Sequence, residues 1–272
     1  MSAYGDAGIN SCAILQRNTE CLLYQPLTSP NYPRAPITEA VIQLRMAADV
    51  DMKALEKIQH RLKPAYPNSQ PLQNVQISLD NTGSQINVVQ NPQGFRLAND
   101  DQTDIVILSP RDITTARLPP YLGWEHLRAK TNTAWKEWKA ATPRHPIERL
   151  GVRFINRIDI PIADDQLFNL QEYLNFYPNT APITMAPMLG YLLQVTVPTF
   201  DPLSIATITT TTLGTAQIPK HHSLILDIDV SRTADIPIID DKLWPLIDQA
   251  RIIKNDIFER CITEASRKLF AS

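Results

Sequence analysis

The stretch RLGVRFINRIDIP, residues 149–161, alternates apolar and polar side chains along most of its length. Successive side chains of a β-strand point to opposite sides of the sheet, so alternate residues share a face. One face of this stretch carries Phe154 and Asn156, and the other carries Arg153 and Arg157. The pattern predicts a strand with one face in a hydrophobic core. Its polar face is expected to be solvated, internally paired or part of a binding site.

Patterned segments on either side of this stretch predict the rest of the fold. Alternating apolar residues indicate strands, and apolar residues spaced three and four apart indicate helices. The predicted elements are, in chain order, a strand at 37–46, a helix at 51–62, strands at 75–80, 85–90, 94–100 and 103–118 (broken at Ser109 and Pro110), a helix at 121–142, the strand at 149–161, a helix at 164–177, strands at 188–198, 203–213 and 223–232, and a closing helix at 241–270. The order of elements in the first half therefore repeats in the second half.

Such a repeated order is typical of an internal duplication. We expect an α+β fold in which two tandem β-α-β-β-β-α units form one continuous, curved antiparallel sheet with the helices packed on one face. The expected parts are an extended N-terminal arm at residues 1–35, a first unit at 36–145 and a second unit at 146–272. The opposite face of the sheet would then form an open, concave surface.

The composition argues against several classes of function. A formal net charge of −2 supplies no basic excess for phosphates, so we expect no nucleic-acid binding. The chain has 8 glycines and 22 prolines, which disfavours a glycine-rich nucleotide-binding loop, and no cofactor is expected. No secretory leader or membrane span is visible, so no membrane contact is expected. The spacing of Cys12, Cys21 and Cys261 fits neither a zinc site nor a disulfide framework, which predicts free thiols in a reducing cytoplasm.

The polar sides of the two predicted strands at 37–46 and 149–161 supply the candidate binding residues. Guanidinium groups bind anions through paired hydrogen bonds, so Arg45 and Arg157 could grip one anion together. The alternative is that these arginines pair with neighbouring carboxylates such as Asp159 and only hold the sheet in register. The residues that we expect to contact a ligand or partner are Arg45, Arg153, Asn156, Arg157 and Glu39.

Signatures of metal binding and catalysis are weak. Asp227 and Asp229 lie on one side of a predicted strand and are candidate metal ligands, but no third ligand accompanies them, so no metal is expected. No nucleophile elbow and no cysteine–histidine pair appear, and none of the 5 histidines has a visible partner that would orient it as a base. We expect no catalytic residue, and a binding protein rather than an enzyme.

Four segments resemble the motifs of a sporadically distributed prokaryotic family of conserved proteins of unknown function. They are PITEAVIQLR (36–45), ARLPPYLGWEHLR (116–128), RLGVRFINRIDIP (149–161) and NDIFERCITEASRKLF (255–270), and they include the family's P-x-x-E-A-V and R-L-G-x-R-F-I-N-R patterns. The resemblance implies no particular activity, cofactor or catalytic residue. Patchy distribution is typical of genes on mobile or defence islands, so the resemblance implies an accessory role in a prokaryote, such as a defence, immunity or toxin–antitoxin-like system.

Together these patterns predict a non-catalytic interaction protein. We expect it to bind a partner protein, or an acidic or peptide-like ligand, on the open face of the sheet, and the N-terminal arm offers a route to homo-oligomers. One alternative is a small-molecule-binding module with a cavity between a long helix and the sheet. Another is a metal-dependent hydrolase or nuclease whose site no local motif reveals.

Overall fold

The computed structural model describes residues 26–27, 30–79, 86–162, 169–179, 189–213 and 218–271, and only the backbone within 74–79 and 86–92. Cys12, Cys21 and most of the predicted arm lie outside the described residues. The elements are β1 (Ile37–Met46), α1 (Met52–Leu62), β2 (Asn68–Leu79), β3 (Ile86–Ala98), β4 (Asp104–Leu108), β5 (Asp112–Arg117), α2 (Trp124–Ala141), β6 (Ile147–Pro161), the 3₁₀ turn η1 (Leu170–Glu172), β7 (Leu192–Pro198), β8 (Ser204–Thr212), β9 (His221–Arg232), α3 (Asp240–Cys261) and α4 (Glu264–Ala271).

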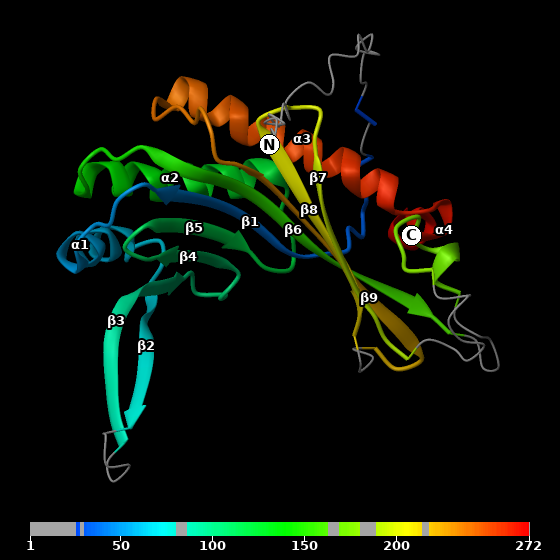
Figure 1. The fold of residues 1–272 in the computed structure, drawn as a ribbon, viewed down its shortest axis with the longest axis horizontal. Coiled ribbons are helices and arrows are strands. Elements are labelled where there is room, and N and C mark those ends of the chain that lie inside the picture. Colours follow the sequence, from blue (N-terminus) through cyan, green and yellow to red (C-terminus); the bar gives the residue numbers. More distant parts are fainter. Residues whose placement is uncertain are drawn as a thin grey trace, which may run out of the picture.

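Within the described part of the chain, nine strands form one antiparallel sheet in the order β2-β3-β4-β5-β1-β6-β9-β8-β7 (Figure 1). The predicted α+β class and the single antiparallel sheet are confirmed. The β2–β3 hairpin projects away from the helices in Figure 1. No helix among the described residues is both long and apolar enough to cross a membrane.

Strands β1 and β6 lie side by side at the middle of the sheet and join its two halves. Ala40 of β1 pairs with Phe154 of β6, and Phe154 pairs with Ile228 of β9. Alternate residues of both strands are buried, as the period-two pattern of the sequence predicts. The face of β6 that carries Phe154 therefore belongs to the core, and the opposite face carries the arginines.

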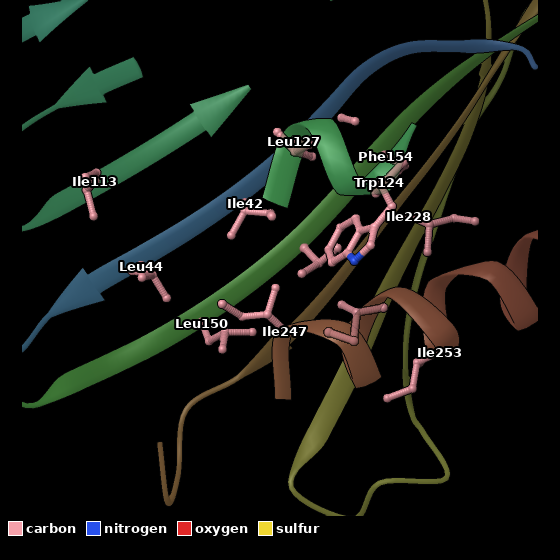
Figure 2. Close-up of a cluster of buried hydrophobic side chains, with 14 of the residues drawn as sticks. Ile42, Leu44, Ile113, Trp124, Leu127, Leu150, Phe154, Ile228, Ile247 and Ile253 are labelled. Carbon is pink, nitrogen blue, oxygen red and sulfur yellow. The ribbon is translucent and has the colours of Figure 1, made fainter. Parts of the chain in front are cut away.

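Two long helices complete the core. Helix α2 contacts β5 and β1, and α3 contacts β6 and β9. Figure 2 shows Trp124 and Leu127 of α2, and Ile247 and Ile253 of α3, gathered with Phe154 in one cluster, and each of them is at most 4% exposed. Burying a side chain of this size contributes about 1.5–3 kcal/mol relative to leaving it in water. The apolar spacing of these helices thus fixes them over the middle of the sheet.

The predicted closing helix is wrong in one respect, because it consists of two helices. Ile262, between α3 and α4, is extended and forms a β-bridge with Leu174. The hydroxyl of Thr263 donates to the carbonyl of Glu172, and its backbone N–H donates to the carbonyl of Tyr173 at 3.1 Å. These contacts from the η1 segment replace the helical hydrogen bonds at that point. Of the predicted helix at 164–177, residues 163–168 lie outside the described residues, and the described remainder contains η1 as its only helical turn.

The two strands predicted at 85–90 and 94–100 are one strand, β3. The intervening Pro92 and Gly94 read as a break in the sequence. Gly94 instead adopts φ +135°, and a Cβ there would collide with the backbone oxygen of Leu108 on β4. The glycine therefore lets two strands approach closely and does not end one.

Candidate functional site

The predicted arginines Arg45, Arg153 and Arg157 form a row with Arg149 on the side of β1 and β6 that faces away from Phe154, and we call these four residues the arginine face. Each has an aspartate partner. Arg45 Nε lies 2.9 Å from Asp112, Arg149 Nη2 lies 2.6 Å from Asp229, Arg153 Nε lies 2.9 Å from Asp227, and Arg157 Nε lies 3.0 Å from Asp159. The pairs of Arg45, Arg149 and Arg153 join neighbouring strands, as the alternative interpretation expects, whereas the Arg157–Asp159 pair lies within β6.

The strand register also separates Arg45 from Arg157, the two arginines that were predicted to bind one anion together. Arg45 lies opposite Arg149 in the β1–β6 pairing, and the interval from Arg149 to Arg157 spans about 26 Å along an extended strand. Arg45 and Arg157 are therefore too far apart to grip one small anion. The hydrogen bond to Asp227 raises the pKa of Arg153. The negative charge of Glu39 adds to that shift, which places Glu39 near Arg153.

Asn156 is not part of the arginine face. It is 1% exposed, and its side-chain amide donates to the carbonyl of Leu226 at 3.0 Å on the core side of β6. The structure thus brings Glu39 and the arginines to one face of the sheet and places Asn156 on the other, where it lines a pocket.

The two candidate metal ligands are engaged in ion pairs. Asp227 accepts from Arg153, and Asp229 accepts from Arg149. Burial raises the pKa of Asp229, while the charges of both arginines oppose that shift. Among the described residues, no group of three or more histidine, cysteine or acidic side chains is placed to hold a metal ion.

A pocket of about 680 Å³ opens on the core side of β6. Its floor includes Phe154 and Asn156, one wall is α3, and the other walls are the segment 30–37 and the loop 119–123. The volume lies within the range of about 300–1,000 Å³ that is typical of small-molecule sites. The pocket lies between α3 and β6, and its use as a small-molecule site stays a prediction.

The segment 30–37 is held in place by the two C-terminal helices. Tyr32 Oη donates to both carboxylate oxygens of Glu259 at 3.1 Å, and its ring packs edge-on against Phe270 with 5.4 Å between the centroids. The backbone N–H of Arg34 donates to the carbonyl of Phe270 at 3.1 Å. Just before this segment, the N–H of Leu27 donates to Asp256 at 2.8 Å. The described end of the predicted arm is therefore a docked wall of the pocket.

Lys254 of α3 lines the pocket although it belongs to the buried side of its helix. Its relative exposure is 5%, and its Nζ lies 3.8 Å from the ring centroid of Phe154 and 5.9 Å from that of Phe258. No acidic side chain in the described part of the chain forms an ion pair with it. Burial and, to a smaller extent, the charge of Arg251 lower the pKa of Lys254 to about 7, and the charge of Glu259 opposes the shift.

The pocket has cationic groups and no acidic residue among its described lining. Arg34, Arg251 and Lys254 all line it. The acid whose charge acts on Lys254 is Glu259, and this carboxylate already accepts from Tyr32 and, at 3.0 Å, from Arg267. The interior of the pocket therefore favours a negatively charged occupant.

The loop 119–123 supplies an aromatic hydroxyl. The ring of Tyr121 packs edge-on against Phe154, with 5.7 Å between the centroids. Burial raises the pKa of Tyr121 to about 12, although the positive charge of Arg251 opposes the shift. The hydroxyl therefore keeps its proton at neutral pH and remains a hydrogen-bond donor within the pocket.

A second polar cluster lies at the start of β4. It corrects the prediction that none of the histidines has a partner that would orient it. His126 Nε2 lies 2.8 Å from Asp104, so this histidine does have a carboxylate that orients it. Arg117 Nη1 lies 3.1 Å from the same carboxylate, and both partners are nearly fully buried. Burial raises the pKa of Asp104, but hydrogen bonds from His126 and Arg117 outweigh it, and the pKa lies below its usual value. This arrangement has the character of a buried structural ion pair.

The pocket cations escaped the sequence analysis, although one signal was available. Lys254 lies four residues after Ala250 and four before Phe258, both of which are buried on α3. A lysine within the apolar stripe of a helix is unusual, because burying an unpaired ammonium group is costly. Such a position marks a candidate site.

No family model matches this chain, and neither does any curated protein. The family resemblance of the four motifs stays a prediction.

Proposed function

We propose that the protein binds a small organic anion in the pocket between α3 and β6. The observation that carries this proposal is the buried Lys254 amine, which lines a pocket without a single acidic residue among its described walls. An anion would supply the charge that the described residues do not place there.

The lining suits a carboxylate attached to a compact apolar body. Arg251 and Lys254 offer charged donors, Asn255 and the protonated hydroxyl of Tyr121 offer neutral donors, and Phe154 offers an apolar surface. Polar groups at fixed positions in a small-molecule site set the orientation of the ligand.

The arrangement of the strands supports a duplicated scaffold for this pocket. From the centre outwards, one half runs β1-β5-β4-β3-β2 and the other runs β6-β9-β8-β7, so the first strand of each half pairs with its last. Each half also has a long helix, α2 on β1 and β5, and α3 on β6 and β9. We infer that the halves are two copies of one unit, with the long helices on one face of the sheet. The pocket then uses the first strand and the long helix of the second unit, which corresponds to residues 146–272.

A binding experiment with a matched pair of variants tests the anion site. Isothermal titration of the full chain with succinate, malonate and inorganic phosphate should show saturable binding of at least one of these anions. Arg251→Gln removes a pocket cation and should weaken that binding about tenfold or more, since charge-assisted hydrogen bonds contribute about 1.5–3 kcal/mol. Arg153→Gln, on the arginine face, should leave it unchanged. Equal losses in both variants, or no saturable binding in the wild type, would refute the proposal.

The arginine face supports a second candidate function, the recruitment of an acidic partner protein. Arg45 and Arg153 keep 41% and 48% of their side-chain surface exposed despite their ion pairs. Arg153 uses Nε and Nη2 for Asp227, which leaves Nη1 for a partner. A double Arg45→Gln and Arg153→Gln variant that keeps every partner co-purifying with the wild type would remove this candidate. Such a partner would be a cytoplasmic protein of the same prokaryotic accessory system. The cytoplasmic location and the accessory role both stay predictions.

A further inference from the structure

We propose that Lys254 is a nucleophilic amine that captures a small 2-oxo acid in the pocket as a reversible imine. This inference rests on the anion site proposed above and adds the class of ligand and the bond that holds it.

The first support is that, within the part of the chain that the structure describes, Lys254 makes no hydrogen bond or ion pair that would explain its burial. The two partly buried lysines of α2 have carboxylate partners: Lys139 Nζ lies 2.6 Å from Asp240, and Lys130 Nζ lies 3.4 Å from Asp104. Lys254 is more deeply buried than either, and its Nζ lies over the ring of Phe154. Within the described residues it has no ion pair, so its amine is not committed to holding the fold together.

The second support is the charge environment of the amine. A buried lysine next to another cation is a recurrent way of making an amine nucleophilic, because both burial and the like charge disfavour the ammonium form. On α3, Arg251 precedes Lys254 by three residues, and residues with that spacing lie on one side of a helix. With a pKa lowered to about 7, close to half of the Lys254 side chains carry a free lone pair at neutral pH.

The other titratable groups around the pocket do not add a free negative charge that would restore the ammonium form of Lys254. Glu259 opposes the shift, but its carboxylate is engaged by Arg267 and Tyr32. Tyr32 and Tyr121 both have a pKa raised to about 12 by burial, so neither contributes a negative charge. The remaining ionisable residue of the described lining is Arg34, which is a cation.

The chemistry requires only the amine and the carbonyl compound. The lone pair of the neutral Lys254 Nζ forms a bond to the carbonyl carbon, while the π electrons of the C=O bond move onto oxygen. Two protons pass from nitrogen to that oxygen, which departs as water when the C=N bond forms. Amine and carbonyl thus give imine and water, without oxidation or reduction. The hydroxyl of Tyr121, in the same pocket, can relay one of these protons, giving its own to the oxygen and taking one from the nitrogen.

The carboxylate of the ligand explains the choice of a 2-oxo acid. In such an acid the carbonyl carbon is bonded directly to the carboxylate carbon. Lys254 and Arg251 are neighbours on the same side of α3, so one can meet the carbonyl while the other meets the carboxylate. A neutral aldehyde or ketone would leave the pocket cations without a counter-charge.

Reductive trapping tests the inference on the full-length chain. The protein is incubated at pH 7 with pyruvate or glyoxylate and sodium cyanoborohydride, which reduces imines to stable secondary amines, and peptide mass mapping then locates the adduct. We expect one adduct per chain, on Lys254, formed at least about tenfold faster than on Lys139, because the amine of Lys139 is held in an ion pair with Asp240. The rate should rise with pH to a plateau just above pH 7.

Two variants and one analogue complete the design. Lys254→Met keeps an apolar side chain of similar length in the buried position and should abolish the fast adduct, whereas Lys139→Met should retain it. Lactate has a hydroxyl in place of the carbonyl oxygen, so it should bind without forming an adduct. Adducts spread evenly over the lysines of the wild type would overturn the inference, and so would a rate that climbs steadily to pH 10.

Binding and capture are separated by the same experiment. If lactate and pyruvate both bind but no adduct forms on Lys254, the imine is refuted and the anion site stands. If neither the 2-oxo acids nor the simple anions bind, both the imine and the anion site are refuted.

Discussion

The arginine face and the pocket lie on opposite sides of the same strand, β6, and they differ in whether their positive charges have acidic partners. On the arginine face each guanidinium has an aspartate, supplied by the same strand or by a strand nearby. In the pocket, Lys254 is buried against Phe154 and has no acidic partner among the described residues. The arginines, whose partners lie in the sheet, stabilise the sheet. Lys254, which is buried without a partner among the described residues, is available to bind a ligand.

Among the substitutions that compare the two sides of β6, we expect the largest loss of stability at Phe154, on the floor of the pocket. Phe154→Ala should lower the free energy of unfolding by about 3–5 kcal/mol, because it leaves a cavity in the centre of the core. Urea denaturation followed by circular dichroism measures the loss. Phe154→Leu should cost much less, and a loss below about 1 kcal/mol for the alanine variant would show that this side of β6 does not carry the core.

Removal of the buried amine should stabilise the protein in a pH-dependent way. The folded-state pKa of Lys254 lies at about 7, below the pKa of 10.5 that a lysine has in an unfolded chain. Below pH 7 both states hold the proton, so the wild type bears the full cost of the buried charge. As the pH rises from 7 towards 10.5, the folded state has lost the proton that the unfolded state still holds, and the cost declines by about 1.4 kcal/mol per pH unit.

Lys254→Met should therefore raise the free energy of unfolding most at pH 6, by about 1–4 kcal/mol, and clearly less at pH 9. Denaturation curves of the variant and the wild type at both pH values measure this difference. A Lys139→Met control, at a half-exposed ion pair, should show no such trend. A gain that is the same at pH 6 and pH 9 would contradict the assignment of the charge penalty to Lys254.

The smallest effect is expected on the arginine face. Arg153→Ala should lower the free energy of unfolding by no more than about 1 kcal/mol, since exposed ion pairs contribute about 0.2–1 kcal/mol and are screened by salt. Denaturation at low and high salt measures the change, and binding of anions in the pocket should not alter. If Arg153→Ala cost as much as Phe154→Ala, the two sides of β6 would not differ in the way that their ion pairs indicate.

Much of the fold could be predicted from local sequence, because local patterns have local causes. The alternation at 37–46 and 149–161 predicts two central strands, and α1 begins directly after Asp51, whose carboxylate accepts the N–H of Ala54 at 2.8 Å. The break between α3 and α4 could not be predicted in this way. It depends on Leu174, which lies far from Ile262 in sequence.

The candidate site was harder to predict, because charge pairing is a property of the folded chain. Arg153 meets its partner Asp227 only once β6 and β9 are paired, across 74 residues of sequence. The sequence therefore showed the arginines but not that they were already neutralised. The burial of Lys254 is equally non-local, since the pocket around it needs the segment 30–37 as a wall.

That wall has a consequence for the order in which the protein forms. The contacts that fasten residues 27–34 to α3, from Leu27 to Asp256 and from Tyr32 to Glu259, bridge 229 and 227 residues of sequence. During synthesis, which proceeds from the N-terminal end, the segment leaves the ribosome long before the helix on which it docks. Until α3 emerges, Tyr32 lacks its partner and the pocket cannot exist. Any ligand of Lys254 can thus be bound only by a chain whose sheet is already complete.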